Sequence, residues 1–300
     1  MKIKIGMVLP QLNESSLRLA KQLGVDGIVA GAPPQAQPGP VYDHWDWLRL
    51  RKQIEDAGLR WLVCESIPIS TRIKLGLPGR DEDIAHFISS LRHMGRAGIP
   101  VLCYNWMVYY WFRTSFTTRV RGGALSMRYV HEDMEQGGLT EVGIVPDEQL
   151  WESLEYFLKV VVPVAEEVNV KLAMHPDDPP LSPIRGVARI MSSVENFQRM
   201  IDLAPSPVNG LTFCQGCFAE MGADLPAAIH RFGSQQKLFF VHYRNLTGSI
   251  TDFTETFHDE GDVDMVAAMR AYYDIGFDGP MRPDHAPTME GEDNTRTGYA

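Results

Sequence analysis

Short apolar runs alternate with longer amphipathic stretches along almost the whole 300-residue chain. Eight runs are typical of β-strands: 3–9, 26–30, 60–66, 99–105, 170–175, 209–214, 237–243 and 279–284. Seven stretches have helical periodicity: 14–23, 45–57, 81–97, 148–168, 194–204, 224–232 and 262–275. Strands that alternate with helices in this way form parallel sheets. Eight strands predict an α/β fold of the (β/α)8 TIM-barrel type, with 1–300 as a single barrel domain.

Two segments interrupt this alternation. Residues 105–147 form a long insertion after the fourth strand, and a loop of this length is usually functional or disordered. Its many aromatic residues argue against disorder, so we expect a lid or an oligomer contact. Only a short polar segment follows the eighth strand, so the last helix is expected to be missing or shortened. A neighbouring subunit could cover the resulting seam, which favours a homo-oligomer.

Composition excludes several classes of protein. The formal net charge is −10, so no basic surface favours a nucleic-acid partner. No run reaches the roughly 18 apolar residues of a membrane helix, and the N-terminus lacks the apolar core of a signal peptide. Four scattered cysteines do not make a secreted disulfide framework. We therefore expect a cytoplasmic protein that acts on a small molecule, without a membrane partner.

Four residues of the types that bind metals lie at the ends of successive strand-like runs. They are His175, Cys214, His242 and Asp284. In a β/α barrel these ends meet at one face, where catalytic groups from several strands gather. Two imidazoles, a thiolate and a carboxylate suit Mn, Fe, Co, Ni or Zn better than Ca or Mg. A site that also leaves positions for substrate favours one divalent ion, Mn²⁺ or Fe²⁺.

Three residues close to these ligands have two interpretations each. Asp177 or Asp178 could orient His175 by accepting a hydrogen bond from it, or both could belong to a solvated turn. Cys217 forms a C-x-x-C pair with Cys214, but no second pair supports a redox or zinc-knuckle site. We expect Cys217 to face the surrounding helices.

Four further residues are candidates for contact with a substrate. Arg244 and Arg282 are cations near the expected ion and could bind a carboxylate, or could form structural ion pairs. His258 lies in the loop after the seventh strand and is added to the substrate-binding candidates. His285 directly follows Asp284 and could still face the cavity, because strand alternation weakens at a strand end.

Several motifs resemble those of the mannonate dehydratase family. They are HPDDPP (175–180), GLTFCQG (210–216), FVHYRN (240–245), FHDEGDVDM (257–265) and MRPDH (281–285). The resemblance extends over nearly the whole chain. It implies a metal-dependent TIM barrel similar to xylose isomerase, which dehydrates D-mannonate to 2-keto-3-deoxy-D-gluconate in hexuronate breakdown.

The resemblance also implies roles for individual residues. The ligands it indicates are the four that the strand ends indicate, with His285 as an acid/base residue. The family uses a tyrosine in a Gly-Tyr pair, for which Tyr299 is the candidate. The family usually continues beyond this point, whereas this chain ends at Ala300, so Tyr299 is expected on a short tail. Two alternatives remain: a metal-dependent sugar isomerase or epimerase, and a catalytically impaired sugar-acid-binding protein.

Overall fold

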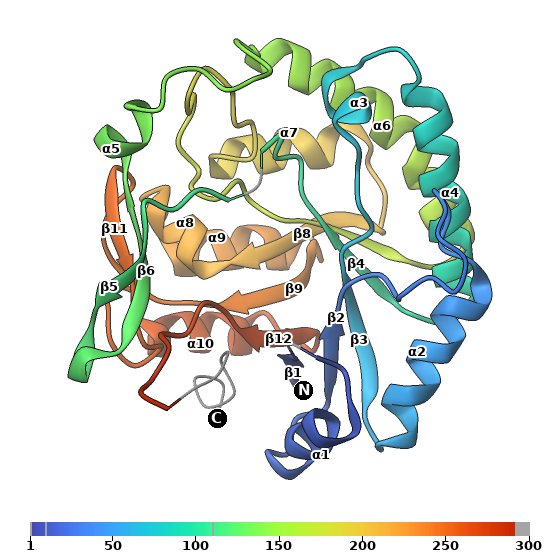
Figure 1. Cartoon of the computed structure of the whole chain (residues 1–300), viewed down its shortest axis with the longest axis horizontal. Helices are drawn as coiled ribbons and strands as arrows, with labels where there is room; N and C mark the ends of the chain where they lie inside the picture. The colour runs from blue at the N-terminus through green and yellow to red at the C-terminus, as the bar shows by residue number, and fades with distance from the viewer. Residues whose placement is uncertain (1, 10, 110, 292–300) are drawn as a thin grey trace.

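The computed structural model describes residues 2–9, 11–109 and 111–291, and its centre is a closed barrel of eight parallel strands (Figure 1). Around the barrel the strands follow the order β1-β12-β9-β8-β7-β4-β3-β2. Their bounds are Lys4–Val8 (β1), Gly27–Ala30 (β2), Arg60–Glu65 (β3), Val101–Tyr104 (β4), Lys171–Met174 (β7), Asn209–Cys214 (β8), Leu238–Tyr243 (β9) and Pro280–Pro283 (β12). Each falls within a predicted run, so the predicted TIM-barrel fold is confirmed.

Seven helices match the predicted amphipathic stretches and lie outside the barrel. They are α1 (Glu14–Gln22), α2 (His44–Asp56), α4 (Arg80–Arg96), α6 (Asp147–Glu167), α7 (Val194–Leu203), α9 (Leu225–Ser234) and α10 (Met265–Asp274). Side chains of Asn13, Ser193 and Asp224 accept hydrogen bonds from backbone amides of the first turns, which explains where three of the helices begin. Three short helices among the described residues were not predicted, because so few residues show no periodicity. They are α3 (Thr71–Leu75), α5 (His131–Glu135) and α8 (Gln215–Glu220).

Apolar side chains fill the barrel beneath its C-terminal face. A cluster of buried strand residues includes Val63, Cys103, Ala173 and Phe240. Because alternate residues of a strand share a face, Phe240 lies on the same side of β9 as His242, and their rings are 4.7 Å apart. The predicted ligands therefore lie above a layer of buried apolar side chains.

The insertion after the fourth strand is folded. It forms β5 (Ser115–Arg119), a 3-10 turn (Arg121–Gly123), β6 (Leu125–Val130) and α5 (His131–Glu135). With β10 (Leu246–Ser249) and β11 (Asp252–Glu255), these strands make a four-stranded antiparallel sheet in the order β10-β11-β6-β5, beside the barrel in Figure 1. We call it the accessory sheet. The sequence indicated none of its strands. Two of its pairings are local hairpins of short strands, β5 with β6 and β10 with β11, and the pairing of β11 with β6 joins segments more than 100 residues apart.

The described residues after β12, as far as Gly291, form no helix, and the rest of the segment in which a last helix was expected to be missing or shortened lies outside the described residues. Leu125 and Thr288 form a single antiparallel bridge that attaches this segment to the accessory sheet. Tyr299 lies outside the described residues. In the described part of the chain, no helix has the length and apolar character needed to cross a membrane.

Candidate active site

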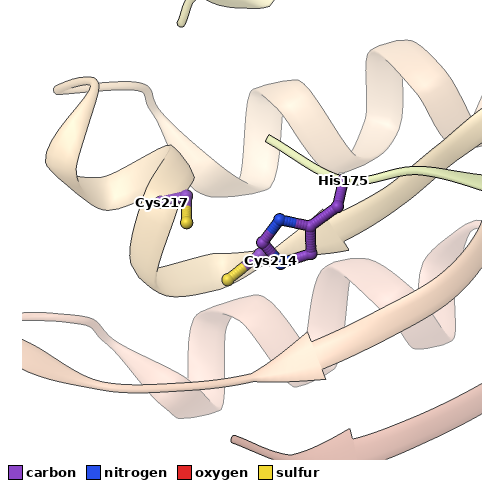
Figure 2. A group of neighbouring side chains, drawn as sticks. All are labelled: His175, Cys214 and Cys217. Atoms are coloured by element: carbon purple, nitrogen blue, oxygen red, sulfur yellow. The ribbon is translucent and has the colours of Figure 1, made fainter. Parts of the chain in front are cut away.

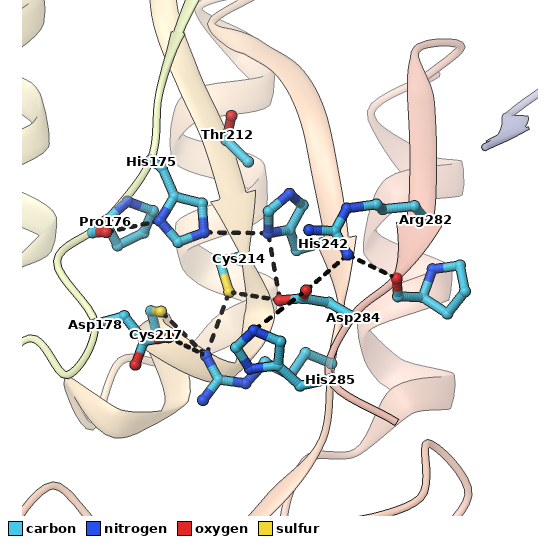
Figure 3. Close-up of polar contacts among 12 residues, drawn as sticks. His175, Pro176, Asp178, Thr212, Cys214, Cys217, His242, Arg282, Asp284 and His285 are labelled. Atoms are coloured by element: carbon cyan, nitrogen blue, oxygen red, sulfur yellow. Dashed lines mark hydrogen bonds and ion pairs between the residues drawn. The ribbon is translucent and has the colours of Figure 1, made fainter. Parts of the chain in front are cut away.

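The four predicted ligands converge at the C-terminal face of the barrel (Figure 3). His175 Nε2 is 3.1 Å from His242 Nδ1, which is 3.4 Å from Asp284 Oδ2, and Cys214 Sγ is 3.9 Å from the same oxygen. Strand register explains this convergence, since Cys214 pairs with His242 across β8 and β9. Four donor atoms from four neighbouring strands can therefore face one ion.

Charge and burial at these residues suit a divalent cation. Cys214, His242 and Asp284 are almost completely buried. Burial opposes ionisation of Cys214, but hydrogen bonds from Cys217, His175 and His242 outweigh it and hold its pKa well below the usual range. Burial also opposes the Asp284 carboxylate, but Arg282 and nearby histidines lower its pKa well below normal. Two anions and two imidazoles at one buried point form a donor set that fits a borderline metal ion.

The other ring nitrogen of each histidine has a partner. His175 Nδ1 donates to the carbonyl oxygen of Pro176 over 2.7 Å, and His242 Nε2 lies 3.1 Å from Glu65 Oε1. Metal-binding histidines typically make such contacts, which set the tautomer and the ring orientation. The expectation that Asp177 or Asp178 orients His175 was wrong, because the backbone supplies the acceptor.

Those two aspartates have other partners. Asp177 accepts a hydrogen bond from the backbone of Met191 over 2.8 Å. Asp178 is ion-paired with Arg113 at 2.9 Å and with Arg244 at 3.2 Å. Both carboxylates are buried, so neither belongs to a solvated turn.

Cys217 does not face the surrounding helices, which corrects the prediction (Figure 2). It lies in α8, and the ligand atoms of His175, Cys214 and Cys217 are all within 4.8 Å of one another. Burial and the neighbouring Cys214 both raise the pKa of the Cys217 thiol well above its usual range. Cys217 is therefore a neutral neighbour of the more acidic Cys214.

Arg244 does not reach the cavity, which corrects its assignment to substrate binding. Its side chain is 0% exposed and pairs with Asp178, Glu220 and Glu255 at distances of 2.8–3.2 Å. Arg244 therefore forms structural ion pairs, which was the alternative interpretation. Three buried carboxylates hold the guanidinium, so it is not available to a substrate.

A small cavity of about 150 Å³ opens beside the predicted ligands. It is lined by Glu65, Ser66, Cys103, Tyr104, Asn105, Met107, Trp111, His175, Asp178, His242, Arg282, Asp284 and His285. A larger cavity of about 410 Å³ opens at the opposite end of the strands, beside Lys4 and Lys171. Barrel enzymes carry their catalytic groups at the C-terminal face, so the smaller cavity is the candidate active site.

His285 and Arg282 both line this cavity. His285 Nδ1 is 2.7 Å from Glu255 Oε2, and its backbone has a left-handed φ of 52°. Burial opposes protonation of this imidazole, but the carboxylates of Asp284 and Glu255 outweigh it and raise its pKa. Arg282 donates to Asp284 Oδ1 over 2.7 Å and is also bound by Glu65.

His258 lies behind Asp284 and is not among the residues that line the cavity. Its Nε2 accepts a hydrogen bond from the backbone amide of Asp284 over 3.2 Å, and its ring stacks on Tyr243. Burial lowers the pKa of His258, in keeping with a neutral acceptor. Contact between His258 and a substrate remains a prediction, and the position of the side chain behind Asp284 does not favour it.

Sequence reasoning missed Glu65, Glu255 and Arg113. Glu65 ends β3, so the strand-end criterion that selected the four ligands could have found it. Glu255 and Arg113 belong to the accessory sheet and to the segment that leads into it. Nothing in the sequence connects these two residues to the barrel.

The protein has a closed parallel barrel, and polar groups from several strands meet at its C-terminal face. This arrangement is that of a TIM-barrel enzyme. Solved structures of the same fold include D-psicose 3-epimerase from Clostridium cellulolyticum (TM-score 0.63, 14% identity, 94% of this chain and 85% of that chain). A xylose isomerase domain protein from Planctomyces limnophilus is also similar (TM-score 0.62, 13% identity, 94% and 90%). At these identities the likeness concerns the fold alone.

Closer similarity identifies the family. The D-mannonate dehydratase family model matches residues 1–144 and 138–300. Mannonate dehydratase of Thermotoga maritima is 37% identical over 92% of this chain and 86% of its own, and mannonate dehydratase 2 of Halalkalibacterium halodurans is 37% identical over 94% and 90%. The crystal structure of mannonate dehydratase from Streptococcus suis superposes with a TM-score of 0.88 at 33% identity, over 99% of this chain and 88% of that chain.

The chain belongs to the mannonate dehydratase family. The resemblance seen in the sequence motifs is thereby confirmed.

Proposed function

We propose that this protein dehydrates D-mannonate to 2-keto-3-deoxy-D-gluconate, as a hydro-lyase of hexuronate catabolism. Family membership over the whole chain supports this proposal. The observation that carries it is the convergence of His175, Cys214, His242 and Asp284 beside a cavity at the C-terminal face.

These four residues would hold one divalent ion, with Mn²⁺ or Fe²⁺ as the proposed metals. Their mixed nitrogen, sulfur and oxygen donors support that choice. A divalent ion bound there supplies Lewis-acid stabilisation for the negative charge that develops on the substrate carboxylate. Because His242 must present an unprotonated Nδ1, metal binding is expected to weaken as pH falls.

Dehydration of an aldonic acid removes the proton on C2 and expels the hydroxyl on C3. We assign one proton transfer to His285 and the other to Tyr299, without deciding which is the base and which is the acid. With Nδ1 of His285 engaged by Glu255, Nε2 is the atom left to exchange a proton with the substrate. The resulting enol tautomerises to the 2-keto acid without further catalysis.

Arg282 is the cation that lines the cavity and is the candidate for the substrate carboxylate. Its own contacts with Glu65 and Asp284 fix its position beside the proposed metal ligands. Arg244 is no longer part of this proposal, since its side chain is 0% exposed and is not among the residues that line the cavity.

The test is to remove bound metal with a chelator and restore Mn²⁺, Fe²⁺, Co²⁺ or Zn²⁺ singly. Formation of the 2-keto-3-deoxy acid is then measured with D-mannonate and with its C2 epimer. We expect product from D-mannonate only when a metal is restored. Full activity without metal would contradict the proposed mechanism, and turnover of ketoses in place of aldonates would favour an isomerase or epimerase.

A cytoplasmic location and a homo-oligomeric state are also part of the proposal. The described chain contains no helix that could span a membrane, and the segment after β12 adds no helix as far as Gly291. Cell fractionation and light scattering of the purified protein would test the two statements.

A further inference from the structure

Glu65 is a carboxylate at the end of β3, at the rim of the same cavity. Its Oε1 lies 3.1 Å from His242 Nε2. Arg282 donates to both of its oxygens, from Nε to Oε2 over 3.2 Å and from Nη2 to Oε1 over 3.1 Å. The Glu65 carboxylate therefore contacts one predicted metal ligand, His242, and also contacts Arg282, which binds a second predicted ligand, Asp284.

We propose that Glu65 is a positioning residue that orients two of the four metal ligands, His242 directly and Asp284 through Arg282. This inference rests on the metal site of the proposed function. Glu65 is not counted among the ligands, because its contact with His242 is on the ring nitrogen that faces away from the other three donors.

The geometry of His242 supports the direct part of this role. Its Nδ1 faces His175 Nε2 at 3.1 Å and Asp284 Oδ2 at 3.4 Å. A carboxylate at Nε2 can only accept, so it favours the tautomer with hydrogen on Nε2 and a lone pair on Nδ1. The same contact limits rotation of the ring, which presents that lone pair in a constant direction.

The indirect part passes through Arg282. Its Nη1 donates to Asp284 Oδ1 over 2.7 Å, which leaves Oδ2 directed at His242 and Cys214 (Figure 3). The Glu65 carboxylate neutralises the guanidinium and holds it in a two-point contact. Removal of Glu65 would leave Arg282 more free to move, and Asp284 with it.

His175 provides an internal comparison. Its outer nitrogen donates to the backbone oxygen of Pro176, a contact that no side-chain substitution removes. The corresponding contact of His242 is made by a side chain, that of Glu65. A substitution of Glu65 should therefore affect metal binding without removing any donor atom.

The experiment measures the affinity of the full chain for Mn²⁺ by calorimetry, after removal of bound metal. The variants are Glu65→Ala, Glu65→Gln and Cys214→Ala, with Asp259→Asn as a matched control. Asp259 is also a carboxylate paired with an arginine, Arg121 at 3.0 Å, but its side chain is 72% exposed and does not line the cavity. Circular dichroism verifies that each variant is folded.

We expect Glu65→Ala to weaken Mn²⁺ binding by about 10–100-fold, the range found for outer partners of metal ligands. Glu65→Gln should lose less, because its amide oxygen can still accept from His242 Nε2 and its shape is conserved. Asp259→Asn should bind as the wild type does, and Cys214→Ala should lose far more than either Glu65 variant. The Co²⁺ absorption spectrum gives a second readout, since a displaced His242 or Asp284 alters the ligand field in the Glu65 variants.

Two results would overturn the inference while the metal site stands. One is wild-type affinity in both folded Glu65 variants. The other is a loss in Glu65→Ala as complete as that in Cys214→Ala, which would make Glu65 a ligand. Failure of the wild-type protein to bind Mn²⁺ or Co²⁺ would instead contradict the metal site on which the inference rests.

Discussion

The imidazole of His285 lies between two carboxylates at the edge of the cavity. Glu255 Oε2 is 2.7 Å from Nδ1, and Asp284 Oδ1 is 3.6 Å from Nε2. Its left-handed backbone, with a φ of 52°, turns the chain just after the ligand Asp284. One residue therefore follows a proposed metal ligand and also faces the substrate cavity, although strand alternation alone would point the two in opposite directions.

Replacement of His285 by glutamine should lower kcat by about 10²–10⁴-fold, the usual contribution of one positioned acid or base. Mn²⁺ content should stay the same, because none of the four ligands changes. Steady-state kinetics with D-mannonate and metal analysis check the two parts. A variant with more than a tenth of wild-type kcat would remove His285 from the mechanism.

Lys74 is a buried cation outside the proposed chemistry. Its ammonium donates to Met107 O over 2.6 Å and to Asn105 Oδ1 over 3.2 Å, and so holds the backbone beside the cavity. Burial lowers its pKa to about 8, although Asp177 partly opposes the shift. The unfolded chain has the ordinary lysine pKa, so between about pH 8 and 10.5 it binds a proton that the folded protein has lost.

The sign of the resulting pH dependence follows directly. This lysine destabilises the fold below pH 8, and its contribution becomes more favourable as pH rises toward 10.5, by up to about 3 kcal/mol. The free energy of unfolding of the wild type, relative to Lys74→Met, should therefore increase between pH 7.5 and 10. Urea denaturation at both values checks this. A difference that is independent of pH would show that Lys74 keeps an ordinary pKa.

At the scale of elements, a buried network of charges joins the accessory sheet to the barrel. Arg113 precedes β5 and pairs with Glu255 of β11 and with Asp178 after β7. Glu255 in turn contacts Arg244 and His285. Glu255 of the accessory sheet therefore holds the proposed acid/base residue. The insertion contributes Arg113, which holds Glu255 in turn.

Removal of Arg113 should be costly, because the buried carboxylates of Asp178 and Glu255 would then share the guanidinium of Arg244, and part of their charge would be uncompensated. Arg113→Met is expected to lower the free energy of unfolding by about 3–5 kcal/mol. Arg128→Met in β6 is the control, since it breaks a half-exposed pair with Asp252 in the same sheet and should cost less than about 1 kcal/mol. Urea unfolding of both variants makes the comparison. Equal losses would contradict the assignment of a structural role to the buried network.

The sequence predicted the barrel elements well and the accessory sheet not at all. The strands of the barrel are apolar runs between turn signals, and helices such as α6 have a long periodic pattern. Strands β5, β6, β10 and β11 have four to six residues each, and several of their side chains are exposed. The pairing of β11 with β6, which joins the two hairpins into one sheet, depends on contacts across more than 100 residues and leaves no local pattern.

For the whole molecule, the apolar core and the proposed metal site make separate contributions to stability. The largest buried cluster runs from Met7 to Met281, packs the helices against the barrel and includes none of the four proposed metal ligands. The barrel should therefore remain folded when metal is removed. Bound metal adds stability only through its preference for the folded state.

A metal titration should raise the midpoint of thermal unfolding progressively. At a free Mn²⁺ concentration 100 times Kd, the added stability should be about 2.7 kcal/mol. Cys214→Ser should show little of this increase, because it lacks one of the four donors. Differential scanning calorimetry with and without Mn²⁺ measures the effect. Equal stabilisation of the wild type and of Cys214→Ser would place the ion elsewhere.

The sequence alone determined the barrel and the four candidate ligands, because strand patterns and strand ends are local features. Closure of the barrel then brings those ends together as a geometric consequence. Only the tertiary structure decided which charges meet. In the folded protein Arg244 is buried among carboxylates and Cys217 lies beside Cys214. Glu65 contacts His242, and Glu255 contacts His285. The pairings of Arg244, Glu65 and Glu255 depend on the distances between separate segments of the chain, and those distances exist only once the chain has folded.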